Sequence, residues 1–281
     1  MEIIRQISPL KEKITEARRQ GSSIGYVPTM GFLHEGHLSL LRHARMANDL
    51  VVLSIFVNPL QFGTGEDFEG YPRNLEHDAG LAADTGCDII FAPVAEEMYP
   101  KECATFTEVE RLTSGLCGAS RPGHFRGVTT VVNKLFNIVS PDRAYFGQKD
   151  AQQAVVVKRM VSDLNMNLKI EVLPTIREAD GIAMSSRNAY LNQHERKAAT
   201  VLYRSLCLAQ EKIAAGERDA SMVKQTIQTV INSEQLAQID YITIVDAENL
   251  LELKQLKNQV LIALAVRFGN TRLIDNIVIE V

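Results

Sequence analysis

Residues 50–56 read LVVLSIF, and this uncharged run constrains the possible folds more than any other feature of the chain. A continuous apolar run of this length is typical of a strand buried on both faces. Both faces of such a strand must be shielded from water by other parts of the chain. The run therefore predicts an interior strand of a sheet that is covered on both faces.

Strand-like and helix-like segments alternate through the first half of the chain. Strands are expected at residues 23–27, 50–56, 88–91, 143–146 and 168–172. Helices are expected at residues 9–20, 38–47, 75–85, 128–139 and 151–164. This alternation predicts a parallel sheet with helices on both faces, and ligands in such folds gather at the carboxyl ends of the strands.

The pattern changes after Pro174. Asn192 and Glu195 predict a capping box at the start of one long helix through Ile213, and a second helix is expected over residues 221–231. Strands are expected at residues 239–245, 260–268 and 277–281. We therefore predict two domains, residues 1–175 with the parallel sheet and residues 176–281 as a smaller α+β domain.

Charge and cysteine usage limit the environment and the partners. The formal charge of −4 weighs against nucleic acid as the main partner, which would require a basic face. The amino-terminal residues lack the apolar stretch of a signal peptide, and no uncharged run is as long as a membrane span. None of the four cysteines forms a CxxC pair, so we expect reduced thiols in a cytoplasmic protein without membrane or nucleic-acid partners.

The segment Thr29–His37, TMGFLHEGH, lies between an expected strand and an expected helix. Its two histidines flank a glycine, so one tight turn can present both imidazoles. The adjacent helix N-terminus favours anions, and imidazole N–H groups can donate to phosphate oxygens. Two surface or metal-binding histidines are the alternative, although no third ligand at a useful spacing supports zinc.

Two further segments carry polar side chains that suit a nucleotide. In Gly147–Asp150, Lys149 can neutralise phosphate and Asp150 can accept from ribose hydroxyls, but taken alone an ordinary helix start explains the segment better. Met184–Asn188 offers two hydroxyls and a guanidinium, or simply a polar hinge loop. Taken together, the three segments have the layout of HIGH-type nucleotidylyltransferases.

Six strings carry a closer resemblance. VPTMGFLHEGH, FVNPLQFG, YPR, HFRGV, FGQKDAQQ and DGIAMSSRN occur in this order across residues 27 to 188. The chain resembles the pantothenate synthetase (pantoate–β-alanine ligase) family over essentially its whole length. That resemblance implies a Rossmann-like domain, a smaller carboxyl-terminal domain that closes over the site, and a homodimer. It also implies ATP, pantoate and β-alanine as substrates, with Mg²⁺ expected through the ATP phosphates.

The resemblance also implies roles for individual residues. His37 would be the catalytic proton donor, with His34 and Lys149 as further catalytic groups, while Gln61 and Gln153 would bind the substrate. ATP would be bound by Met30, Gly31, Phe32, Leu33, His34, Glu35, Gly36, His37, Gly147, Gln148, Lys149, Asp150, Ile176, Met184, Ser185, Ser186 and Arg187. Gln148 stands where the family often has Glu, and Phe32 where it often has a small residue, so these two contacts are expected to differ in detail.

Some residues and functions stay open at this point. Four residues lie in loops that glycine or proline interrupts, and they either border the site or face solvent: Asn58, Arg121, His124 and Arg126. The remaining histidines are expected on the surface. A nucleotidyl transferase that releases a nucleotide-containing product is the nearest functional rival. A truncated tRNA synthetase would need a basic RNA-binding extension, and none is obvious in the sequence. A catalytically silent ATP-binding regulator would not need the histidines. Both alternatives are therefore less expected than the ligase.

Overall fold

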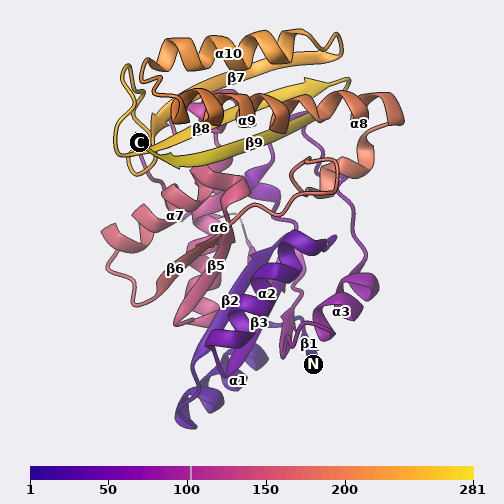
Figure 1. Cartoon of the computed structure of the whole chain (residues 1–281). Coiled ribbons are helices and arrows are strands. Elements are labelled where there is room, and N and C mark those ends of the chain that lie inside the picture. Colours follow the sequence, from indigo (N-terminus) through magenta and orange to yellow (C-terminus); the bar gives the residue numbers. More distant parts are fainter. Residues whose placement is uncertain (102) are drawn as a thin grey trace. The chain divides into compact units, whose positions relative to one another are not determined.

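The computed structural model describes residues 1–101 and 103–281, which form two compact units (Figure 1). The first unit comprises residues 1–110, 121–147 and 156–174. The second comprises residues 111–120, 148–155 and 175–281. Closure of a carboxyl-terminal domain over the site stays a prediction.

The first unit is built on a six-stranded sheet with the strand order β1-β4-β3-β2-β5-β6. All of its strand pairs are parallel, as the alternation predicted. The strands are β1 (Glu2–Ile4), β2 (Ile24–Thr29), β3 (Leu50–Ile55), β4 (Ile89–Phe91), β5 (Arg143–Gly147) and β6 (Lys169–Leu173). The apolar run forms interior strand β3, and only edge strand β1, which is three residues long and too short to show a period, was not predicted.

Helices cover both faces of this sheet because successive side chains of a strand point in opposite directions. Val27 packs in one cluster with Leu41 of α2, while the Tyr26 ring meets Phe136 of α6 at a centroid distance of 6.3 Å. The elements around the sheet are α1 (Ile7–Arg19), α2 (Glu35–Ala47), η1 (Pro59–Gln61), α3 (Leu75–Ala83), α4 (Ala95–Met98), α6 (His124–Val139) and α7 (Ala151–Asp163). The first residues of α7 belong to the second unit.

The second unit is the predicted α+β structure. Its antiparallel sheet has the order β7-β8-β9, and helices α8 to α10 pack against one face (Figure 1). The elements are α5 (Leu116–Ser120), η2 (Gln148–Asp150), η3 (Ser186–Tyr190), α8 (Gln193–Ala199), α9 (Val201–Ala214), α10 (Ala220–Asn232), β7 (Ala237–Asp246), β8 (Gln259–Phe268) and β9 (Thr271–Glu280).

Two predicted elements of this unit need correction. The capping box of Asn192 and Glu195 is present, but the expected single helix is divided at Thr200, whose hydroxyl donates to the Lys197 carbonyl. Strand β9 begins at Thr271 rather than at Ile277. The early part was missed because polar residues at 275 and 276 interrupt its apolar pattern, although both are buried.

Within the described part of the chain, no helix is long and apolar enough to cross a bilayer. Cys87, Cys103, Cys117 and Cys207 are free thiols.

Candidate functional site

The turn between β2 and α2 depends on a glycine. Gly31 has a φ of +90°, a conformation that side chains with a Cβ rarely adopt. A Cβ there would also lie only 2.8 Å from Ile55 Cγ2 and 3.0 Å from Asp78 Oδ2. The following residue, Phe32, is left-handed as well, with a φ of +51°. The chain thus reverses tightly between the strand and the histidines.

A carboxylate from α3 holds this turn in place. Asp78 is 1% exposed, and its two oxygens accept hydrogen bonds from the backbone N–H groups of Phe32 (2.8 Å) and Leu33 (2.7 Å). These bonds offset the cost of burying a charge and stabilise the left-handed residue. Sequence reasoning missed Asp78 because nothing local distinguishes it from any acidic residue in the first turn of a helix. The neighbouring His77, expected on the surface, is exposed but stacks on Phe32 with ring centroids 6.3 Å apart.

The two histidines of the turn cap their own helix. His34 Nδ1 accepts from Gly36 N (3.2 Å), and His37 Nδ1 accepts from His34 N (3.3 Å). Their rings are stacked with centroids 4.0 Å apart and an interplanar angle of 30°. Because each Nδ1 acts as an acceptor, each neutral ring carries its proton on Nε2. The turn therefore presents two stacked imidazoles whose N–H donors point away from the backbone that they cap.

Gln61 lies beside this turn, at the end of η1. Its amide nitrogen is 3.0 Å from Met30 Sδ, and its side-chain oxygen accepts from Asn58 Nδ2 at 3.1 Å. Asn58 is itself 1% exposed and accepts from the Tyr99 hydroxyl at 2.9 Å. Burial raises the pKa of Tyr99, which keeps that hydroxyl protonated as a donor. Asn58 is thus a buried support for Gln61 rather than a solvated loop residue.

The residues left open around the start of α6 divide into two groups, since Arg121 precedes the helix while His124 and Arg126 lie in its first turn. His124 Nδ1 lies 2.8 Å from the Gln61 carbonyl oxygen, and Arg121 donates to the same oxygen at 3.3 Å. Arg121 also makes a two-point ion pair with Glu66, both contacts at 2.6 Å. Burial opposes ionisation of Glu66, but Arg121 holds the pKa of that carboxyl below its usual value. Arg126, in contrast, is exposed and stacks on Phe106.

Close packing of α6 against η1 sets the position of Gln61, and it predicts a sensitive glycine. A Cβ at Gly127 would lie 2.1 Å from the Leu60 carbonyl oxygen and 2.6 Å from Gln61 Cα. Gly127→Ala should therefore lower the free energy of unfolding by about 1–3 kcal/mol, the usual cost of overpacking. Thermal unfolding measures this loss. Gly80→Ala, at an exposed site on α3 with no atom within 4 Å, is the matched control and should unfold at or above the original temperature. Equal melting temperatures for Gly127→Ala and the unaltered protein would refute the close-packing argument.

The second unit contains the remaining candidate segments. Lys149 lies in η2 with 20% of its side chain exposed, 3.7 Å from Asp150, and Gln153 is half-buried on α7. Residues 176–184 form a hairpin in which Met184 N donates to the Ile176 carbonyl at 2.9 Å. The turn of this hairpin is made at Gly181, which has a φ of +89°.

The segment Met184–Asn188, which contains the two serines and Arg187, is hydrogen-bonded to this hairpin. Ser185 caps η3 by accepting from Arg187 N at 3.2 Å, and Ser186 is 7% exposed. Asn188 Nδ2 donates to Glu178 Oε1 at 2.7 Å and to the Ala183 carbonyl at 3.1 Å. Within this unit the fold therefore brings Ile176 and Met184–Arg187 together. The first unit holds Met30–His37, Gln61 and Gly147.

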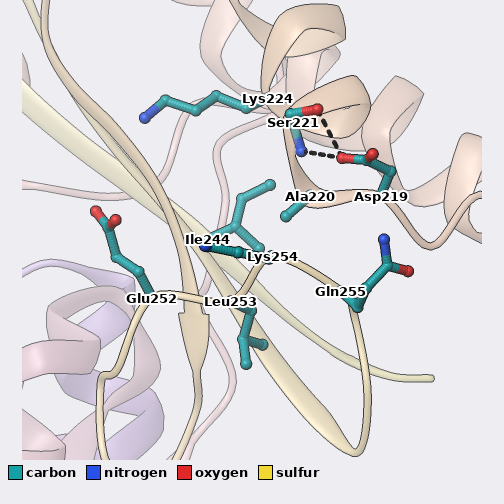
Figure 2. A pocket seen from close by; sticks show the side chains of 9 residues that line it. All are labelled: Asp219, Ala220, Ser221, Lys224, Ile244, Glu252, Leu253, Lys254 and Gln255. Atoms are coloured by element: carbon teal, nitrogen blue, oxygen red, sulfur yellow. Dashed lines mark hydrogen bonds between the residues drawn. The ribbon is translucent and has the colours of Figure 1, made fainter.

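A cavity of about 400 Å³ in the second unit is separate from these segments (Figure 2). Asp219, the N-cap of α10, accepts from the backbone N–H and the hydroxyl of Ser221 at its wall. None of the candidate site residues lines this cavity, whose walls are Asp219, Ala220, Ser221, Lys224, Ile244, Glu252, Leu253, Lys254 and Gln255.

Comparison with known proteins identifies the family. The sequence model described as pantoate-beta-alanine ligase matches residues 2–278. A pantothenate synthetase of Moorella thermoacetica is 58% identical over 281 residues, which span 100% of this chain and 99% of that protein. The crystal structure of pantothenate synthetase from Thermus thermophilus superposes with a TM-score of 0.94 at 45% identity, covering 99% of both chains.

A second solved relative carries ligands. It is the pantoate-beta-alanine ligase of Francisella tularensis, complexed with beta-gamma ATP and beta-alanine. Its TM-score is 0.80 at 34% identity, covering 99% of this chain and 97% of that one. The family match, the sequence identity and the shared fold all extend over nearly the whole chain. The chain therefore belongs to the pantoate-beta-alanine ligase family and is a ligase of pantothenate biosynthesis.

Proposed function

We propose that this ligase condenses pantoate with β-alanine in two steps and that its residues act mainly on phosphate. In the first step the pantoate carboxylate attacks the α-phosphorus of ATP, and pyrophosphate leaves. In the second, the β-alanine amine attacks the acyl carbon of pantoyl adenylate; AMP leaves, and the amine loses a proton. Neither step requires a protein nucleophile, so positioning and charge stabilisation supply most of the rate.

The observation that carries this proposal is the pair of capped histidines. Their Nδ1 atoms accept from backbone N–H groups, so the caps hold their Nε2–H donors in a fixed direction. Donors that are preorganised toward developing charge stabilise a transition state without further reorganisation. We assign His34 and His37 to the triphosphate, and we assign His37 the role of proton donor. Both belong to an ATP-binding turn that runs from Met30 to His37.

The carboxylic acid and the amine are assigned to two glutamine side chains. Gln61 would bind pantoate and border the β-alanine site, and Gln153 would bind pantoate. The proximity of the Gln61 amide to Met30 supports its placement beside the ATP turn. Ile176 would contact the adenine region, while Gly147–Asp150 and Met184–Arg187 would bind the rest of ATP.

The remaining assignments concern the metal and the assembly. Among residues 1–101 and 103–281, no three His, Cys, Asp or Glu side chains are grouped to hold a metal ion. We therefore propose that Mg²⁺ enters with ATP, held by its phosphates, where it would neutralise part of their charge. We also propose a cytoplasmic homodimer with two domains, residues 1–175 and 176–281, that close over the substrates and exclude water.

Product analysis tests the reaction type. With ATP, pantoate and β-alanine, AMP and pyrophosphate should appear in equal amounts with pantothenate. A nucleotidyl transferase of the rival type would release a product that still contains the nucleotide. Detection of that product in place of AMP would refute the ligase reaction.

Substitution of either of two cationic side chains should slow adenylation more than the attack by the amine. Lys149→Ala should slow adenylation by about a hundred-fold, the effect of losing one preorganised charge donor. Attack by the amine should change less, because pyrophosphate has already left. Arg187→Lys should also be impaired if its guanidinium binds two oxygens, since an ammonium cannot reproduce that geometry. Single-turnover formation of the adenylate measures both effects, and a normal rate for Lys149→Ala would refute its assignment.

A further inference from the structure

Strand β9 contains two adjacent buried polar residues. Asp275 is 2% exposed and Asn276 is 4% exposed, although their neighbours along the sheet are mostly apolar. Adjacent side chains of a strand point to opposite faces, so the two residues extend to different sides of the three-stranded sheet. Buried polar groups are destabilising unless they are hydrogen-bonded, so the partners of this pair indicate why it is there.

The side chain of Asn276 is bonded entirely to the η2 segment. Its amide nitrogen donates to the carbonyl oxygens of Gln148 (3.1 Å) and Lys149 (2.9 Å). Its amide oxygen accepts from Gln148 Nε2 at 3.1 Å. Both side-chain N–H groups and the oxygen are thus used on two successive residues. This three-point contact holds the backbone from which the Lys149 side chain extends.

The side chain of Asp275 is bonded to the hairpin of residues 176–184. Its two oxygens accept from the Arg177 guanidinium at 2.7 and 2.9 Å, and one also accepts from Asn276 N at 2.7 Å. Burial raises the pKa of Asp275, and the contacts with Arg177 oppose that shift. Arg177 is itself held by the Gly181 carbonyl at 3.0 Å and by the Tyr203 ring, 3.9 Å away.

We propose that Asp275 and Asn276 are positioning residues for the adenylation step. Asn276 sets the direction of Lys149, and Asp275, through Arg177, sets the hairpin that carries Ile176 and Met184. This inference rests on the proposed role of Lys149 at the phosphates. A lysine has a flexible four-carbon stem, so its ammonium is placed accurately only if its backbone is held. Neither positioning residue touches substrate in this proposal.

Asn276→Asp tests the proposal because it keeps the size of the side chain and replaces the amide donor with a carboxylate that faces two carbonyl oxygens. Adenylation, measured as pyrophosphate exchange, should fall by about ten- to a hundred-fold, as expected for a small misplacement of a catalytic group. Conversion of supplied pantoyl adenylate and β-alanine to pantothenate should stay close to the original rate. A merely structural defect would lower both rates together and would overturn the proposal.

Asn276→Ser provides a second variant in case the buried carboxylate prevents folding. It removes the three-point contact without adding charge, and it should show the same selective loss. Asp240→Asn is the matched control, because Asp240 lies on β7 and pairs with Arg272 of the same strand β9. Its adenylation rate should remain normal, and a defect equal to that of the Asn276 variants would overturn the proposal.

A double-variant cycle separates this inference from the proposed function. If Asn276 acts through Lys149, Lys149→Ala combined with Asn276→Asp should be no slower in adenylation than Lys149→Ala alone. Multiplied losses would overturn the inference while leaving the role of Lys149 intact. Normal adenylation by Lys149→Ala would overturn the role of Lys149, and with it the inference. Normal adenylation by both Asn276 variants, with Lys149→Ala impaired, would overturn the inference alone.

Discussion

His34→Ala and His37→Ala should each lower kcat/KM by about a hundred- to a thousand-fold, the effect of removing one preorganised donor. Both imidazoles would present an Nε2–H to the triphosphate as negative charge builds on its oxygens. The loss should appear mainly in kcat, because the donor matters most in the transition state. Steady-state kinetics with saturating pantoate and β-alanine measures it.

The structure supplies controls for this prediction, because each histidine also caps helix α2. An alanine would remove a cap as well as a donor, and loss of a cap costs about 1 kcal/mol of stability. His34→Asn and His37→Gln place a side-chain oxygen where the Nδ1 acceptor was, the arrangement of an ordinary capping box. These variants should melt near the original temperature yet remain as impaired as the alanine variants. Recovery of turnover together with stability would show that the histidines serve only the helix.

Exchange of labelled pyrophosphate into ATP should occur with enzyme, Mg²⁺, ATP and pantoate in the absence of β-alanine. The adenylation step needs no amine, so it should run in both directions once the carboxylate is present. Omitting pantoate should abolish the exchange completely, because nothing would then attack the α-phosphorus. This is an all-or-none effect, measured by recovery of label in ATP.

Adding β-alanine provides the complementary measurement. The amine should drain the adenylate to pantothenate and AMP, so exchange should fall as AMP accumulates. A concerted reaction of all three substrates would show no exchange until the amine is added. Exchange that requires β-alanine would therefore refute the adenylate-first order even if the overall products were correct.

Much of the fold followed from local pattern. The apolar run at residues 50–56 predicted strand β3, and the alternation around it predicted a parallel sheet covered on both faces. The Asn192–Glu195 capping box was also correct, because a cap depends on residues three apart in the chain. The apolar pattern did not predict the first part of β9. Its polar residues 275 and 276 suggest a solvent-facing segment in the sequence, although both are buried in the structure.

The sequence by itself determined where the histidine turn lies, because a glycine-bearing segment between a strand and a helix leaves few alternatives. Only the tertiary structure decided which side chains hold that turn and which hold the η2 segment. Asp78 bonds to Phe32 from 46 residues away, and Asn276 bonds to Gln148 from 128 residues away. Periodicity reports which face of an element is buried, but it carries no information about which distant polar side chain meets it there. The packing of the strands and helices decides which polar side chains meet, because it brings remote donors and acceptors within hydrogen-bonding distance.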